Sequence, residues 1–153
     1  MAKTDLMFDV RLPGGSPTAL IKALTTTDGI AAFWTSGVRG DAATGQRVEL
    51  DFPAPDGTAR YELSTTAATE DAVTWAYVGG DNPAWMGTQM TFRVVGPSPM
   101  GGDATMVSFI HAEFEGEAAQ SVPFITYIWA QILGRLKTHV EDGAVNPFFD
   151  PAG

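Results

Sequence analysis

A chain of 153 residues, 44% of them apolar, can bury one sizeable core but is too short for two ordinary domains. Eighteen acidic residues against nine basic ones give a net charge of −9, which repels nucleic acid phosphates and anionic lipid surfaces, so no nucleic acid or membrane partner is expected. There is no cysteine, and His111 and His139 lie too far apart for a local metal motif, so we expect no disulfide, metal or cofactor.

The N-terminal segment predicts a strand followed by a short helix. TDLMFDVRL (4–12) alternates apolar and polar residues with the period of a half-buried strand. Ser16 can cap a helix that begins at Pro17 and runs to about Leu24. The first ten residues lack the basic and apolar regions of a secretion signal, and no stretch approaches the roughly 18 apolar residues of a membrane span. We therefore expect a soluble, cytoplasmic protein.

A second short helix and a run of strands follow. Thr27 or Asp28 can cap the helix DGIAAFW (28–34). Between residues 34 and 111 five or six alternating runs are separated by Gly, Pro and Asp, which predicts an antiparallel sheet with one apolar face. The clearest runs are QRVELDF (46–52), ARYELSTTA (59–67), AVTWAYV (72–78), TQMTFRVV (88–95) and ATMVSFIH (104–111).

The longest amphipathic segment, YIWAQILGRLKTHVEDG (127–143), predicts a helix near the end of the chain. Pro123 suits its first turn, and Gly143 stands where a left-handed C-terminal residue is wanted. One apolar face of the sheet needs a cover, so this helix is expected to lie across the concave face. The residues at helical spacing are Ile128, Trp129, Ile132, Leu133, Leu136 and Val140.

This order of elements resembles the helix-grip fold of the START-like, Bet v 1-like (SRPBCC) superfamily, and within it the group named after the activator of Hsp90 ATPase. The likeness is carried by residues 21–35, by the GG before a threonine-led strand in 101–111, and by 129–143. It implies an α+β fold: a curved antiparallel sheet of six or seven strands, two short helices, and a long C-terminal helix across the concave face. A single domain is expected over 1–145, followed by a tail, 146–153.

The resemblance implies a cavity between the sheet and the last helix that holds an apolar or aromatic small molecule. Relatives include ligand-sequestering proteins, cyclases or dehydratases of polyketide-like substrates, and a chaperone activator, and they share no catalytic signature. Binding is therefore the first hypothesis, and the same inward positions could equally be solid core. The expected ligand-binding residues are Trp75, Tyr77, Phe92, Phe109, His111, Phe124, Ile128, Trp129 and Ile132.

Two other functions remain open. A cyclase or dehydratase acting on a polyketide-like or aromatic substrate needs an acid or base in the cavity, for which His111 and Tyr77 are the candidates. A hydrogen-bonded histidine at the edge of the core is the commoner role for such a residue. A co-chaperone with a chaperone partner needs an exposed apolar patch, which only the tail NPFFDPAG (146–153) offers. We rank binding above catalysis and catalysis above protein interaction.

The connection YVGGDNPAWMGTQ (77–89) is rich in aromatic residues and methionine. Trp85 and Met86 could form a lid over the cavity mouth, or Trp85 could pack locally in a hairpin loop. The sequence favours neither alternative over the other.

Charged residues at strand ends and on strand faces complete the candidate positions. Glu113, Glu115 and Glu117 alternate, but such a run is more typical of a solvated loop than of a metal site. Arg60 and Arg93 are out of phase with the apolar residues of their strands, so they are expected on the outer face of the sheet and not at a ligand carboxylate.

Overall fold

The computed structural model describes residues 4–12, 16–97, 105–114, 120 and 122–151. A strand, two short helices, a run of six strands and a long final helix follow one another along these residues, which is the predicted order. The elements are β1 (Thr4–Leu12), α1 (Pro17–Leu24), α2 (Thr27–Phe33), β2 (Gly37–Gly40), β3 (Arg47–Ala54), β4 (Gly57–Ala68), β5 (Ala72–Gly80), η1 (Pro83–Trp85), β6 (Gln89–Pro97), β7 (Thr105–Phe114) and α4 (Val122–Asp142).

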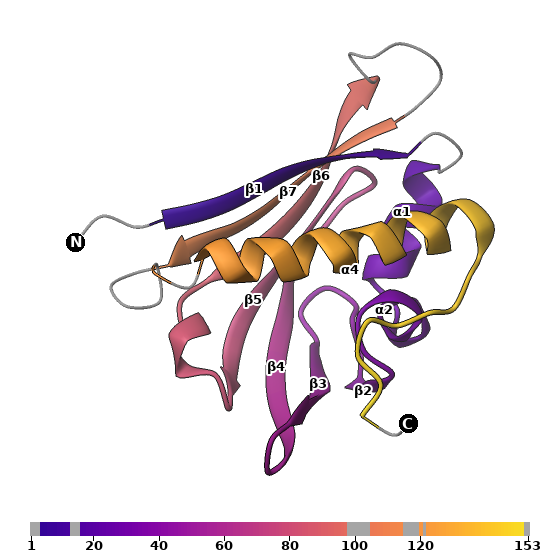
Figure 1. The fold of residues 1–153 in the computed structure, drawn as a ribbon. Coiled ribbons are helices and arrows are strands. Elements are labelled where there is room, and N and C mark those ends of the chain that lie inside the picture. The colour runs from indigo at the N-terminus through magenta and orange to yellow at the C-terminus, as the bar shows by residue number, and fades with distance from the viewer. Residues whose placement is uncertain (1–3, 13–15, 98–104, 115–119, 121, 152–153) are drawn as a thin grey trace.

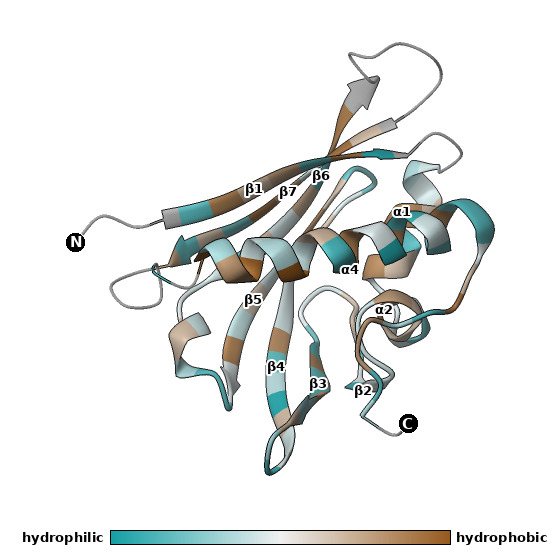
Figure 2. Cartoon of the chain, viewed as in Figure 1, coloured by the Kyte–Doolittle hydropathy of each residue, from teal (hydrophilic) through white to brown (hydrophobic). Residues whose placement is uncertain are grey.

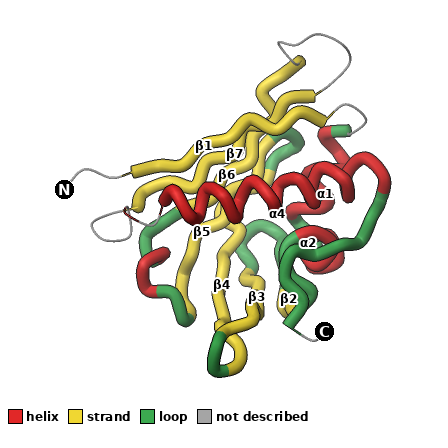
Figure 3. The backbone as a smooth tube through the Cα atoms, in the orientation of Figure 1, coloured by secondary structure: helices red, strands yellow, loops and turns green. Residues whose placement is uncertain are grey.

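The strands of the described residues pair into one antiparallel sheet with the order β1-β7-β6-β5-β4-β3-β2. Alternate side chains point to the same face of a strand, and on β5 the residues Val73, Trp75 and Tyr77 are all buried. The helices lie on one face of the sheet, as Figure 3 shows. The sheet and helices confirm the predicted helix-grip architecture of α+β type.

Helix α4 runs across the sheet (Figure 1) and buries its apolar face against it. Trp129, Ile132, Leu133 and Leu136 are buried, while brown and teal residues alternate along the helix in Figure 2. Gly143 has a φ of 72° and its N–H donates to the carbonyl of His139 at 2.8 Å, which ends the helix as predicted. The last helix is therefore the cover of the sheet.

The first short helix begins where the sequence places it. The hydroxyl of Ser16 accepts a hydrogen bond from the N–H of Ala19 at 3.1 Å, and Pro17 is the first residue of α1. Pro17 has no N–H to leave unsatisfied, so this start is compatible with an open first turn. Leu24 is its last residue, as predicted.

The second short helix begins one residue earlier than expected. Thr26, and not Thr27 or Asp28, is the N-cap of α2, because its backbone is extended and its hydroxyl accepts from the N–H of Gly29 at 3.1 Å. A Cβ on Gly29 would lie 2.3 Å from the carbonyl oxygen of Ala23. Glycine is therefore required where α2 packs against α1.

The C-terminal segment turns back from α4 and runs beside the end of α2 (yellow in Figure 1). The N–H groups of Phe148 and Phe149 donate to the carbonyls of Phe33 and Trp34 at 3.1 and 2.9 Å. A parallel bridge then joins Phe149 to Thr35. Both phenylalanines are half-buried against the core, so the described part of the tail adds a wall to the fold.

Candidate functional site

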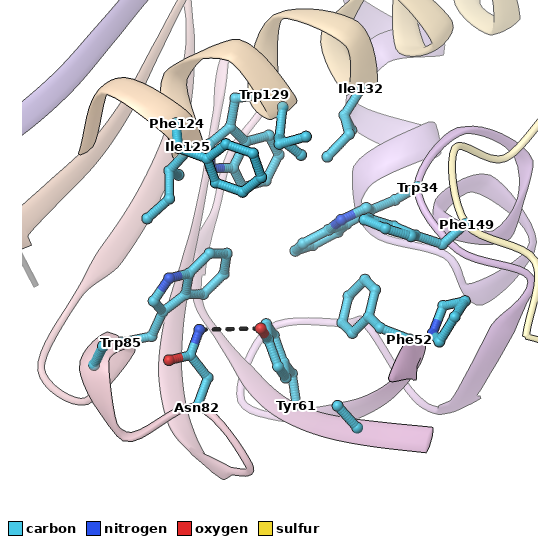
Figure 4. Close-up of a pocket in the computed structure, with 14 residues that line it drawn as sticks. Trp34, Phe52, Tyr61, Asn82, Trp85, Phe124, Ile125, Trp129, Ile132 and Phe149 are labelled. Atoms are coloured by element: carbon cyan, nitrogen blue, oxygen red, sulfur yellow. Dashed lines mark hydrogen bonds between the residues drawn. The ribbon is translucent and has the colours of Figure 1, made fainter. Parts of the chain in front are cut away.

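A cavity of about 450 Å³ lies between α4, the β3 and β4 part of the sheet, the η1 connection and the C-terminal segment (Figure 4). Its size falls in the range of about 300–1,000 Å³ that is usual for small-molecule pockets. We refer to it as the aromatic cavity. It is lined by Trp34, Phe52, Pro53, Ala59, Tyr61, Asn82, Ala84, Trp85, Phe124, Ile125, Ile128, Trp129, Ile132 and Phe149.

Half of the fourteen lining residues are aromatic. The indole of Trp129 lies 5.0 Å from that of Trp34 and 6.4 Å from that of Trp85, measured between ring centroids. On the side of the cavity that the sheet forms, the ring of Phe52 contacts that of Phe149 edge to face, with 5.1 Å between the ring centroids. Six of these rings contact another ring, which supports the shape of the wall before any ligand enters; they are Trp34, Phe52, Tyr61, Trp85, Trp129 and Phe149.

One end of the aromatic cavity carries a hydrogen-bonded polar pair, drawn as the dashed line in Figure 4. The side-chain amide of Asn82 donates to the hydroxyl of Tyr61 at 3.0 Å, and the backbone N–H of Asn82 donates to the hydroxyl of Tyr77, also at 3.0 Å. Burial raises the pKa of Tyr61 above 10.0, more than the hydrogen bond from Asn82 lowers it. The hydroxyl of Tyr61 therefore keeps its proton at neutral pH.

A glycine lets the chain place this pair. Gly80, at the end of β5, has a φ of 126°, and a Cβ there would lie 2.2 Å from the carbonyl oxygen of Arg60. The next residue, Asp81, donates its N–H to that carbonyl and accepts the N–H of Arg60 on its carboxylate, both at 2.8 Å. The turn is thereby pinned to β4, and Asn82 is held above Tyr61.

The structure brings four of the nine predicted ligand-binding residues together at the aromatic cavity, all of them from α4. These are Phe124, Ile128, Trp129 and Ile132. The other five, which are Trp75, Tyr77, Phe92, Phe109 and His111, are buried in the core and do not line the cavity.

His111 lies deep in the core, with no exposed surface, and not at the edge. Its imidazole contacts Trp129 and Thr88 through hydrogen bonds, and the ring of Trp85 packs edge-on against it at 4.5 Å. Burial lowers its pKa from 6.5 to about 3. An imidazole in this position is neutral and separated from the cavity by two indoles, so it is poorly placed to transfer a proton to a ligand.

Sequence reasoning missed several lining residues. Phe52 and Tyr61 stand in the alternation of their strands, and that signal could have found them. Phe149 lies in the tail, far in sequence from the strands that form the opposite wall of the cavity. Trp85 is only 7% exposed and forms part of the wall, whereas its neighbour Met86 is 55% exposed. The connection therefore contributes a buried wall residue, which favours local packing over the alternative of a lid.

The outer face of the sheet carries charged side chains, as expected for Arg60 and Arg93, which are both exposed. Arg39 pairs there with Asp51 and Glu49. The described residues contain no group of three or more His, Cys, Asp or Glu side chains that could hold a metal ion.

Two motifs that the sequence analysis named lie partly in segments that the structure does not describe. Glu115 and Glu117 of the predicted acidic loop lie outside the described residues, as do Gly101 and Gly102 of the GG motif. Among the described helices none is long and apolar enough to cross a membrane.

The fold defines a class of protein, because a curved antiparallel sheet gripped by a long C-terminal helix is the helix-grip arrangement. No family model and no curated protein matches the sequence. Solved structures do match. The Aha1 dimer from Colwellia psychrerythraea is 24% identical with a TM-score of 0.67, over 94% of this chain and 98% of that one.

Two further solved structures are similar in fold to this chain. Major latex-like protein 151 from ginseng, Panax ginseng, is 12% identical with a TM-score of 0.66, over 90% of this chain and 97% of that one. A protein from Staphylococcus epidermidis solved by NMR is 13% identical with a TM-score of 0.71, over 95% and 94%. The chain therefore has the fold of the START-like, Bet v 1-like superfamily, as the sequence indicated.

Proposed function

We propose that this protein binds an apolar or aromatic small molecule in the aromatic cavity. The observation that carries the proposal is the composition of the wall: seven of its fourteen residues are aromatic and none is charged. A ligand that covers these rings removes apolar surface from water, at about 25 cal/mol per Å². Phe124, which is 68% exposed beside the mouth, would be covered in the same way.

The wall favours binding over the catalytic alternative. A cyclase or dehydratase needs an acid or base that reaches its substrate. Of the two candidates, His111 is enclosed in the core and Tyr77 uses its hydroxyl to accept the N–H of Asn82. The lining residues of the described chain include no Asp, Glu, Lys, Arg or His. Binding without chemistry is the function that this wall suits best.

The interaction alternative loses its main support as well. It needs the tail as an exposed apolar patch, but Phe148 and Phe149 are packed against the core. Phe149 is moreover a wall residue of the aromatic cavity. The tail therefore supports ligand binding better than it supports docking of a chaperone.

Native mass spectrometry of the purified protein tests the proposal first, because a tightly held ligand is expected to co-purify. A panel of flavonoids, aromatic polyketides, fatty acids and sterols is then titrated while indole fluorescence and the melting temperature are recorded. Trp34, Trp85 and Trp129 all line the cavity, so an occupant changes their emission. Binding to the native state also raises the melting temperature by mass action.

Two neighbouring residues of α4 supply a matched pair of variants. Ile128→Gln puts an amide into the wall and is expected to weaken binding by about tenfold or more. Tyr127→Gln makes the same change at a side chain that is 64% exposed and outside the wall, so it leaves affinity unchanged. If no compound of the panel shifts either signal in the wild type, the proposal is wrong.

A further inference from the structure

The polar end of the aromatic cavity has unused hydrogen-bonding capacity. The hydroxyl of Tyr61 accepts from Asn82, and no group of the described residues accepts its own proton. The side-chain oxygen of Asn82 likewise receives no hydrogen bond from the described residues. Exchanging the oxygen and nitrogen of the amide would make the Tyr61 hydroxyl donate to Asn82 and would leave the two amide N–H groups as the spare donors, so the pair offers a donor to a ligand oxygen in either orientation.

This polar pair is isolated among rings. Phe52 lies 4.6 Å and Trp85 5.1 Å from the ring of Tyr61, and Figure 4 shows them on either side of it. A polar group in apolar surroundings costs free energy until it finds a partner. A ligand oxygen that reaches the hydroxyl of Tyr61 would supply that partner, whereas a hydrocarbon would leave it unsatisfied.

The charges around Tyr61 and Asn82 limit which kind of ligand oxygen can bind there. No lining residue of the described chain is cationic, so a ligand carboxylate would lose its hydration without gaining a counter-ion. Asp81 directly precedes Asn82 in the turn, and its carboxylate adds to burial in raising the pKa of Tyr61. An anionic headgroup would be repelled by the same carboxylate.

We propose that Tyr61 and Asn82 determine specificity and select an uncharged, planar aromatic molecule whose carbonyl oxygen accepts the Tyr61 hydroxyl proton. This inference rests on the proposed function, because it assigns a ligand class to the aromatic cavity. A phenol hydroxyl next to the carbonyl would use the spare acceptor of Asn82. The rings of Trp34, Trp85 and Trp129 would then contact the hydrocarbon part of the ligand.

A series of four probes of nearly equal shape tests the inference: fluorene, 9-fluorenone, 2-hydroxyfluorene and fluorene-2-carboxylate. Dissociation constants are measured by indole fluorescence and checked by the shift in melting temperature. In the wild type we expect 9-fluorenone to bind at least about fivefold tighter than fluorene, which is the effect of one hydrogen bond. The carboxylate is expected to bind at least about tenfold weaker than fluorene.

The variants separate recognition from packing. Tyr61→Phe removes the hydroxyl and should bring the ratio of the fluorene and fluorenone affinities to about one, and Asn82→Ala should lower the same ratio. Phe149→Leu replaces a wall ring that has no polar group with a smaller side chain, so it should weaken the binding of both probes by the same factor. If Tyr61 had only a structural role, Tyr61→Phe would also weaken the binding of both probes together and would leave the ratio of their affinities unchanged.

The outcomes distinguish the two proposals. Equal binding of fluorene and 9-fluorenone to the wild type, or a ratio that survives both Tyr61→Phe and Asn82→Ala, overturns the inference and leaves the proposed function intact. Tightest binding of the carboxylate overturns it too. Binding of a quaternary ammonium compound in preference to the whole series would show an aromatic cage for cations instead. If neither this series nor the broader panel binds, the proposed function fails as well.

Discussion

The indole Nε1–H of Trp129 donates a hydrogen bond to Nδ1 of His111 over 3.1 Å, which fixes the tautomer of the imidazole. An indole only donates, so Nδ1 must carry no proton and Nε2 must carry one. Nε2–H then donates to the hydroxyl of Thr88 at 3.0 Å, and that hydroxyl donates to the carbonyl of Trp85 at 2.6 Å. The chain of hydrogen bonds has one direction and joins α4 to β7 and η1.

Protonation of His111 would place a new Nδ1–H against the Nε1–H of Trp129. The folded protein should therefore resist this protonation. With a pKa of about 3 folded and 6.5 unfolded, the unfolded state binds more protons between these two values. The free energy of unfolding should therefore fall as the pH drops below 6.5. The slope approaches about 1.4 kcal/mol per pH unit, so about 2 kcal/mol is lost between pH 7 and pH 5.

Urea denaturation of the wild type and of His111→Gln measures this linkage. Carboxylates titrate in both proteins, so the difference between the two slopes isolates His111. We expect the variant to have the flatter curve between pH 7 and pH 5. Equal slopes would show that burial leaves the pKa of His111 at its unfolded value.

The inward face of the sheet could be predicted from the sequence, but the hollow part of it could not. The two-residue period correctly identifies Trp75 and Phe109 as inward residues, because side-chain direction alternates along any strand. Whether an inward side chain meets a ligand depends on what fills the space opposite. At β7 the ring of Trp129 lies 4.6 Å from that of Phe109, and this contact closes the space.

The open part of the interior depends on residues that are far apart in sequence. Phe149 reaches Phe52 only because the tail pairs with Thr35, and no local pattern in NPFFDPAG predicts that pairing. The sequence does not indicate the short strand β2 (Gly37–Gly40) either, since two of its four residues are glycines and no apolar alternation develops. Local periodicity therefore gave the cover helix and the core strands, while the cavity required tertiary contacts.

Glycine at position 80 is predicted to be irreplaceable, and Gly57 provides the matched control. Both have positive φ, 126° and 135°, so alanine strains the backbone at each position. Only at Gly80 does the added Cβ also meet a carbonyl, that of Arg60 at 2.2 Å, whereas at Gly57 nothing lies within 4 Å.

We expect Gly57→Ala to cost about 1 kcal/mol of unfolding free energy and Gly80→Ala at least about 2 kcal/mol more. Urea denaturation gives both values. Because Gly80 places the turn that carries Asn82, its variant should also lose the preference for 9-fluorenone. Equal costs at the two positions would mean that the turn relaxes around the new side chain.

Glu113 holds a left-handed backbone in a strand, with a φ of 77°. It lies in an irregular part of β7, where Leu6 pairs with His111 but Thr4 pairs with Phe114, so that both His111 and Phe114 are buried although they are three residues apart. The extra residue reorients Phe114 toward the core. No sequence signal marks this position, since glycine or asparagine is the usual residue in that conformation.

Two substitutions at this position separate the side chain from the backbone. Glu113→Ala and Glu113→Gly remove the same carboxylate, but only glycine adopts positive φ without a steric cost. We expect the glycine variant to be about 1 kcal/mol more stable than the alanine variant, which reverses the usual order in strands. Thermal and urea denaturation measure the difference. A more stable alanine variant would show that β7 adopts a regular register in solution.

Arg135 of α4 holds the segment that completes the aromatic cavity. Its Nη1 donates to the carbonyls of Asn146 and Pro147 at 3.0 and 3.2 Å, and its guanidinium lies 5.3 Å from the ring centroid of Phe148. Arg135→Met keeps an apolar stem but removes these contacts, so it should destabilise the attachment of the tail by about 1–2 kcal/mol.

Hydrogen exchange reports this attachment directly, because the amides of Phe148 and Phe149 donate to carbonyls of the α2 end. In Arg135→Met these two amides should exchange about tenfold faster, while those of β5 keep their protection. Lys137→Met is the control, since the pair that Lys137 forms with Glu141 along the helix is an interaction of about 0.5 kcal/mol or less. Since Phe149 is a wall residue, a loosened tail should also speed ligand release. Unchanged exchange at Phe148 and Phe149 would mean that the backbone hydrogen bonds hold the tail without Arg135.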